Sequence, residues 1–173
     1  PHNDADIQKL KKQTPGHEVR RMAAVRHKLL DTNFLSADEH IELLKSHDIL
    51  SYKKDGIQHG VFKKLRLGYY QTEARLDLHK KTVDEARREV YRFIKDCMQY
   101  DLRTVIILHG KGDRNENKEA VIKTYLNKWL PEFDEVLAFH SAQKHHGGAG
   151  AVYVLLRKSD REKQFNRERF GIR

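Results

Sequence analysis

Strand-like and helix-like segments alternate through residues 75–158, and this alternation constrains the fold more than any other feature of the chain. The segment RTVIILHG, residues 103–110, holds a continuous apolar run, as expected for a strand that is buried on both faces. Amphipathic helices are predicted before it, over about 83–98, and after it, over about 118–130. Three further strands are predicted at residues 75–79, 134–142 and 151–158.

The resulting order, β-α-β-α-β-β, predicts an α/β fold. Strands that alternate with helices are joined by right-handed crossovers, which favours a mostly parallel four-stranded sheet. The short last connection lets the fourth strand run antiparallel. Thr82 and Glu85 form a capping-box pattern at the start of the first helix, and Cys97 falls on the apolar stripe of that helix. Cys97 is therefore predicted to be an inert core residue.

The first 70 residues are helix-biased but broken by turn residues. Apolar residues share one helical face over residues 17–30, and Ser36 with Glu39 predicts a short capped helix reaching Ile41 and Leu44. The sequence predicts a helical or flexible extension at residues 1–50 and a basic aromatic linker at residues 51–74. A compact domain follows at residues 75–158, and a basic tail at residues 159–173. The extension is expected to be dispensable for folding of the compact domain.

Positive charge is concentrated beside the compact domain. The net charge is +9, and residues 51–80 and 151–173 each hold seven basic against three acidic side chains. This favours nucleic acid as a partner over a purely solubilising role. In the linker, Lys63, Lys64 and Arg66 alternate with aromatic residues, which either bind phosphates and bases or pack the linker onto the domain.

The chain has a single cysteine, so an intramolecular disulfide and a four-cysteine zinc site are both excluded. A reducing, cytoplasmic compartment is therefore expected. No apolar run approaches the ~18 residues of a membrane span, so no membrane partner is predicted.

Polar side chains follow two strands that the crossover makes neighbours. His79 ends the first strand, His109 follows the second, and Asp77 lies two positions before His79 on the same face. Ligands bind beyond the carboxyl ends of parallel strands. Asp77, His79 and His109 are therefore predicted to converge at one rim as catalytic residues, with both imidazoles partly exposed and titrating near neutral pH.

Two glycine-containing loops are candidate phosphate-binding elements. Gly110 and Gly112 allow a tight turn with exposed amides around Lys111, although an isolated GxG is a weak signal and no Walker motif is present. The loop HHGGAGA either lies beside the ligand or is a simple hairpin connection. The predicted binding residues are Lys80, Gly110, Lys111, Gly112, His145, His146, Gly147, Gly148 and Gly150, with Lys63, Lys64 and Arg66 of the linker.

No tightly bound cofactor is predicted. The histidines and Asp77 lack the spacing of an HExxH or paired-cysteine metal site. Asp77 together with substrate phosphates would suit a loosely held Mg²⁺ or Mn²⁺, so both a metal-dependent and a metal-free mechanism stay open.

Three motifs resemble the small MutS-related domain, the Smr family: LDLH before a capped helix, HGKG after an apolar strand, and GGAGAVYVLL near the end. The upstream segment DGIQHGVFKKLRLGYY is similar to the one that precedes this domain in stand-alone bacterial members. The resemblance covers residues 55–158. It places Asp77 and His79 on the LDxH element and Gly110 to Gly112 on the glycine loop. Members often have glycine after the LDLH histidine, where this chain has Lys80.

The resemblance implies a two-layer α/β sandwich similar to the C-terminal domain of translation initiation factor three. It also implies an endonuclease that nicks DNA or cleaves RNA, including messenger RNA on stalled ribosomes. In such a mechanism His79 and His109 would share the proton transfers, and Lys111 would hold the phosphate. The alternatives are a non-catalytic module that binds nucleic acid or the ribosome, and a protein-interaction domain. A binder has no use for two imidazoles at neighbouring strand ends, which favours the enzyme.

Overall fold

The computed structural model describes residues 32–38, 40–112 and 119–171. Its contacts divide the chain into two units, residues 1–33 and residues 34–173, and the description below concerns the second unit. The helix predicted over residues 17–30 lies outside the described residues.

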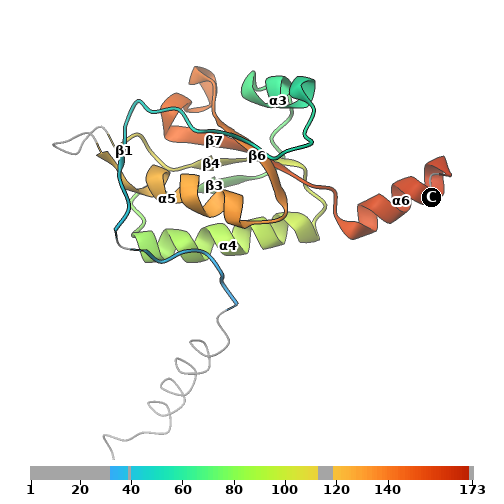
Figure 1. Ribbon diagram of the computed structural model, residues 1–173, viewed down its shortest axis with the longest axis horizontal. Coiled ribbons are helices and arrows are strands. Elements are labelled where there is room, and N and C mark those ends of the chain that lie inside the picture. The colour runs from blue at the N-terminus through green and yellow to red at the C-terminus, as the bar shows by residue number, and fades with distance from the viewer. Residues whose placement is uncertain (1–31, 39, 113–118, 172–173) are drawn as a thin grey trace, which may run out of the picture. The chain divides into compact units, whose positions relative to one another are not determined.

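A five-stranded mixed sheet forms the centre of the second unit (Figure 1). Its strands, in spatial order, are β2 (Ser51–Lys53), β6 (Val136–Ser141), β7 (Ala151–Leu156), β4 (Thr104–Leu108) and β3 (Arg75–Asp77). The α/β class is confirmed. The predicted mostly parallel sheet of four strands is wrong, because β3 and β4 form the one parallel pair in the sheet and β2 adds a fifth strand.

The position of β7 explains this difference. The strands β3, β4 and β6 do run in the same direction, as the helices between them predict. However, β7 inserts between β4 and β6 and pairs antiparallel with both. Its antiparallel direction was predicted, but its central place was not.

One face of the sheet is covered by two helices, α4 (Val83–Gln99) and α5 (Val121–Trp129), with the short 3₁₀ helix η1 (Leu130–Glu132) after α5 (Figure 1). The Thr82 hydroxyl accepts the N–H of Glu85 at 3.1 Å, so the predicted N-cap is confirmed. Cys97 is buried in the core, and burial raises the pKa of its thiol to about 12. It is therefore a core residue, as predicted.

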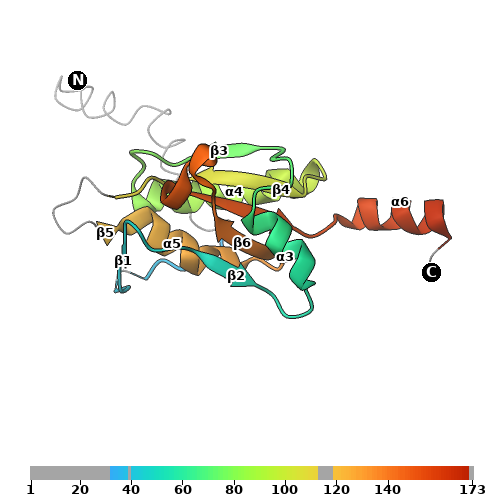
Figure 2. The same cartoon turned by 90° about the horizontal axis from the view of Figure 1, so that it is seen from above.

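The other face of the sheet is covered only in part. Helix α3 (His59–Arg66) lies over β6 and β7 (Figure 2). Its Leu65 packs in one cluster with Tyr153. The predicted linker over residues 51–74 thus supplies both a strand and a helix of the domain. Phe62 packs against the same cluster, which supports the packing role for this residue, while Tyr69 stays exposed.

The described residues between Phe34 and Leu50 form no helix, so the short helix predicted after Ser36 is wrong. The described part of this segment holds β1 (Leu44–Lys45), which pairs with β5 (Glu119–Ala120). Instead of capping a helix, Ser36 donates its N–H and hydroxyl to the Glu132 carboxylate at 3.2 and 3.1 Å. Helix side chains also bind the backbone of the segment, as in the Trp129 Nε1 bond of 2.8 Å to the Ser36 carbonyl.

These contacts move the domain boundary. Leu35 and Leu50 are buried in the core, and the compact unit begins at Phe34. The predicted boundary at residue 75 is therefore too late.

The predicted basic tail forms helix α6 (Asp160–Phe170). The Ser159 hydroxyl caps it by accepting the N–H of Glu162 at 3.1 Å, and Arg161 pairs with Asp101 at 2.7 Å. Among the residues described, no helix combines the length and the apolar character that crossing a membrane requires.

Candidate active site

The parallel pairing of β3 with β4 brings the two predicted histidines to one rim. Asp77 is paired with Leu108, so His79 and His109 both follow the strand ends at the same edge of the sheet. Both line one groove. His79 and His109 therefore meet at one rim, and Asp77 is joined to them through its hydrogen bonds to His79. The catalytic role of the three residues stays a prediction.

Asp77 and His79 form a hydrogen-bonded pair. The Oδ1 atom of Asp77 lies 2.6 Å from Nδ1 of His79 and also accepts the backbone N–H of His79 at 2.9 Å. These bonds, the backbone one first, hold the pKa of the Asp77 carboxyl below its usual value. A carboxylate can only accept, so Nδ1 carries the hydrogen and Nε2 is left as a free acceptor.

The chain after this pair is held by local geometry. Leu78 is buried and its N–H donates to the Leu108 carbonyl at 2.7 Å, which extends the β3 pairing by one residue. Lys80 then adopts a φ of 61°, in the left-handed region that favours glycine. This explains why glycine suits the position after the LDLH histidine. Lys80 adopts the same turn at a cost of about 1–2 kcal/mol.

His109 does not have the predicted exposure. It is 6% exposed, its Nδ1 donates to the Gly110 carbonyl at 2.7 Å, and its buried Nε2 has no hydrogen-bond partner among the described residues. Burial lowers the pKa of the imidazole to about 4, and the nearby charges of Lys123 and His79 act in the same direction. The expectation that His109 titrates near neutral pH is therefore wrong. At pH 7 His109 is neutral and supports the loop.

The HGKG loop is closed against the last glycine loop. The Gly150 carbonyl accepts the N–H groups of both His109 and Gly110 at 3.0 Å. These two amides are therefore closed to a ligand, whereas exposed amides were predicted in this loop. The amides of Lys111 and Gly112 make no such bond within the described residues. Gly110 has a φ of 81°, and a Cβ atom there would lie 3.3 Å from the His79 ring. The His79 ring thus packs directly against the backbone of the glycine loop at Gly110.

The loop between β6 and β7 forms the third side of the site. It contains two short 3₁₀ helices, η2 (Lys144–His146) and η3 (Gly148–Gly150). His145, His146, Gly147 and Gly150 line the groove, whereas Gly148 does not. The rings of His145 and His146 lie 4.0 Å apart, centroid to centroid. This loop is therefore part of the site and not only a connection.

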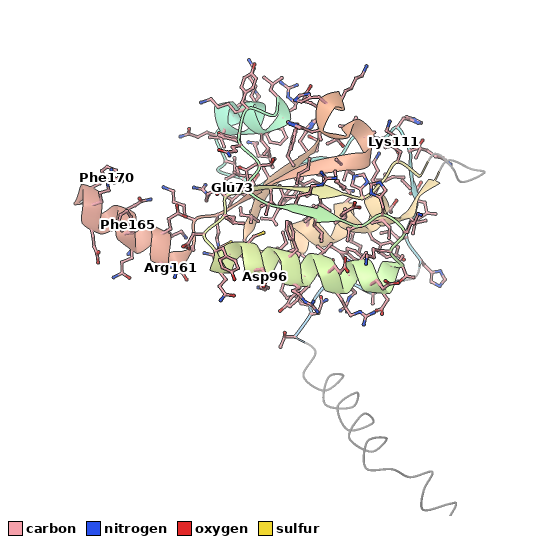
Figure 3. All side chains as sticks on the ribbon, turned by 180° about the vertical axis from the view of Figure 1, so that it is seen from behind. Glu73, Asp96, Lys111, Arg161, Phe165 and Phe170 are labelled. Carbon is pink, nitrogen blue, oxygen red and sulfur yellow. The ribbon has the colours of Figure 1, made fainter. Side chains whose placement is uncertain are left out.

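The groove follows β3 and the end of β4, where Arg75 and Leu108 line it. Its volume is about 1390 Å³. Glu73 and Lys111 both line it and lie at opposite ends of β3 in Figure 3. Lys80 and Gly112 are also at the groove, but Lys63, Lys64 and Arg66 are exposed on α3 and do not line it.

Comparisons with known proteins identify the family of the chain. The sequence model of the Smr domain matches residues 76–157. The probable DNA endonuclease SmrA of Escherichia coli (strain K12) is 38% identical over 174 residues, which cover 97% of this chain and 91% of that protein. The chain belongs to the Smr domain family.

Two further relatives are informative. The ribosome rescue factor SmrB of Aliivibrio salmonicida (strain LFI1238) is 34% identical over 74% of this chain and 69% of its own length. The crystal structure of YdaL, a stand-alone small MutS-related protein from Escherichia coli, matches with a TM-score of 0.65 and 40% identity, covering 73% of this chain and 96% of that one. The family resemblance read from the three motifs is therefore confirmed.

The Smr domain offers few ligands for a metal ion. Within the described ranges, no group of three or more histidine, cysteine, aspartate or glutamate side chains is placed to hold one. Asp77 uses Oδ1 for His79, which leaves one carboxylate oxygen. A cation at Asp77 would fit only if substrate phosphates supplied most of its remaining ligands.

Several groove residues of this Smr domain were not predicted from sequence. Thr72, Glu73 and Arg75 line the groove because β3 is an edge strand. Tyr153 supports the site from the centre of the sheet, where its hydroxyl bonds His146. A signal was available for Tyr153, because it alternates with Val152 and Val154 on β7 and so faces the groove side with Ala151 and Leu155.

Proposed function

We propose that this Smr domain is an endonuclease that cleaves phosphodiester bonds in the groove along β3 and β4. The Asp77–His79 pair carries the proposal. Asp77 keeps the hydrogen on Nδ1, so Nε2 of His79 is an acceptor at the groove, and the negative charge of Asp77 stabilises the imidazolium that forms when Nε2 takes a proton. A module that only binds nucleic acid would not need this arrangement.

The reaction follows from the groups at the groove. His79 Nε2 removes the proton from an attacking hydroxyl, either of water or of a ribose. The attacking oxygen bonds to phosphorus, and the leaving oxygen departs with the electron pair of its bond. The leaving oxygen then takes up a proton from water, and the imidazolium of His79 returns its proton to the solvent. Lys111, with the amides of Lys111 and Gly112, binds the non-bridging oxygens while negative charge develops. His109 is neutral and holds the glycine loop, so it is a positioning residue.

The names of the relatives support two kinds of substrate. SmrA is named as a probable DNA endonuclease and SmrB as a ribosome rescue factor. Both DNA and ribosome-associated RNA are therefore candidate substrates. The second candidate function is a non-catalytic module that binds nucleic acid or the ribosome. It is favoured by the name of SmrB and by the exposed basic residues of α3, Lys63, Lys64 and Arg66.

A loosely held Mg²⁺ or Mn²⁺ stays part of the proposal. Such an ion, bound by Asp77 and phosphate oxygens, would neutralise charge on the phosphate. The proton transfer to His79 does not depend on it.

Cleavage of supercoiled plasmid and of structured RNA tests the proposal. Wild-type protein is incubated with each substrate, with and without EDTA, beside His79→Ala and the control His59→Ala, which removes an exposed imidazole of α3 outside the groove. We expect cleavage by the wild type and by His59→Ala, and none by His79→Ala. Binding of both substrates without any cleavage would support the binding module instead. Loss of wild-type cleavage in EDTA would make the metal essential.

A further inference from the structure

A second imidazole at the groove is held by a buried hydroxyl. His146 lines the groove at the end of η2, and Tyr153 lies beneath it on β7 with 1% of its surface exposed. The Tyr153 hydroxyl is hydrogen-bonded to Nδ1 of His146, and the two rings meet edge to face at 82°. Nothing in the proposed reaction so far uses this pair.

The hydrogen bonds of the Tyr153 hydroxyl determine which nitrogen of His146 carries the hydrogen. The backbone N–H of Gln143 donates to the Tyr153 oxygen at 3.2 Å. The hydroxyl must place its own hydrogen on another acceptor, since buried polar groups are almost always paired. His146 Nδ1 is the one acceptor in contact with it in the described part of the chain. Nδ1 therefore accepts, and the hydrogen of the neutral ring lies on Nε2.

A positively charged His146 would disturb this arrangement. Its Nδ1 would then be a donor, and the buried hydrogen of Tyr153 would lose its acceptor. Burial also raises the pKa of Tyr153, so the hydroxyl keeps its hydrogen. In this arrangement His146 accepts at Nδ1 and donates from Nε2.

His79 and His146 consequently carry their hydrogens on opposite ring nitrogens. His79 donates from Nδ1 to Asp77 and leaves Nε2 as an acceptor, whereas His146 accepts at Nδ1 and leaves Nε2–H as a donor. We propose that His146 is a phosphate-binding residue that donates its Nε2–H to a non-bridging oxygen of the phosphodiester attacked at His79, and that Tyr153 is the positioning residue that holds this hydrogen on Nε2. The proposal rests on the proposed nuclease function for the identity of the phosphate.

The surroundings hold this donor in place. Gly68, just after α3, approaches Tyr153 so closely that a Cβ atom there would lie 2.7 Å from the hydroxyl oxygen. Gln143 is fixed in turn, since its side-chain amide donates to the Arg66 carbonyl at 2.8 Å. Gly147 turns the chain directly after His146 with a φ of 119°. The end of α3 is therefore connected to the groove through Tyr153.

The first experiment reads the hydrogen positions without any substrate. Two-bond ¹H–¹⁵N correlation spectra of the full chain are recorded at alkaline pH, where free histidine is neutral, and His79→Gln and His146→Gln provide the assignments. We expect the Nδ1–H form for His79 and the Nε2–H form for His146, and a mixture of forms for His146 in Tyr153→Phe. An Nδ1–H form of His146 in the wild type overturns the proposal.

The second experiment measures cleavage. His146→Ala should lower kcat by ~100-fold, the usual effect of removing one donor to a charged transition state. His146→Gln, whose amide can replace the Nε2–H donor, should keep more activity. Tyr153→Phe should lower kcat by ~10-fold with little change in KM, because the donor is kept but no longer held in place. The control is Tyr125→Phe, which removes a buried hydroxyl bonded to the Asp38 carbonyl on the opposite face of the sheet.

The outcomes separate the two proposals. Normal cleavage by His146→Ala and Tyr153→Phe overturns the role of His146 and leaves the nuclease function intact. An equal loss in Tyr125→Phe and Tyr153→Phe also overturns it, since general destabilisation would then explain both. A wild type that cuts neither substrate removes the nuclease function. Titration with inorganic phosphate then tests His146 by itself. A shift of its Nε2 resonance would support phosphate binding by the Nε2–H group, and an unchanged resonance would overturn it.

Discussion

The Oδ1 atom of Asp77 accepts two hydrogen bonds from one residue, from Nδ1 of His79 at 2.6 Å and from its backbone N–H at 2.9 Å. The carboxylate therefore fixes both the ring and the main chain of His79. We expect Asp77→Asn to lower kcat by ~100-fold, because the amide has no charge to stabilise the imidazolium. Both side chains are about half exposed, so the melting temperature and nucleic-acid affinity should change little. A large loss of melting temperature would show that the pair is structural.

Acid should destabilise the protein through His109. Its pKa is 6.5 in an unfolded chain and about 4 in the folded one, so between these values the unfolded state binds a proton that the folded state does not. The contribution of His109 to the free energy of unfolding is fully present above pH 6.5 and decreases as the pH falls toward about 4. The total loss from this group is roughly 3 kcal/mol. Thermal melting at the two ends of this range should show a smaller difference in His109→Gln than in the wild type. Equal differences would mean that His109 is not responsible.

Charge on α3 should contribute to nucleic-acid affinity at a distance from the groove. Reversing Lys63 and Lys64 to glutamate should weaken binding and make the plot of log affinity against log salt less steep, because fewer counterions are released. Arg88→Glu with Arg92→Glu is the matched control, since these residues are exposed on α4 on the other face of the sheet. Similar slopes for both double variants would argue against an α3 contact.

Two glycines of the α3 region should respond oppositely to alanine. Gly68 has a φ of 73° and touches Tyr153, so Gly68→Ala should destabilise the fold by at least about 1–2 kcal/mol and reduce cleavage as Tyr153→Phe does. Gly60 lies within α3 with nothing near its Cβ position, so Gly60→Ala should stabilise by about 0.5–1 kcal/mol. Denaturant unfolding of both variants measures the difference. A neutral Gly68→Ala would show that Tyr153 can move.

Removing residues 34–50 should unfold the domain. Leu35 and Leu50 are buried, and each contributes roughly 1.5–3 kcal/mol through burial. A chain that begins at Thr32 should give the melting temperature of the full chain, whereas one that begins at Ser51 should melt far lower or not fold. A stable, cooperative domain from Ser51 would restore the expectation that residues 1–50 are dispensable for folding.

Features that depend on near neighbours in the chain could be predicted from sequence. The helix over α4 follows from the spacing of apolar residues and the Thr82 cap. Asp77 and His79 share a face because side chains alternate along a strand, and two positions apart they point the same way. The parallel crossover from β3 to β4 follows from the intervening helix, and it brings His109 to the same rim.

Features that depend on distant residues were decided by the tertiary structure. Ser36 and Glu39 have the pattern of a helix start, but Ser36 binds Glu132, 96 positions away, and the described residues around Ser36 are not helical. His109 follows its strand like His79, yet the packing around it buries the ring and lowers its pKa. His146 acquires a defined hydrogen position only because β7 lies in the middle of the sheet and places Tyr153 beneath it. Burial and hydrogen-bond partners come from packing, and the local sequence pattern does not contain them.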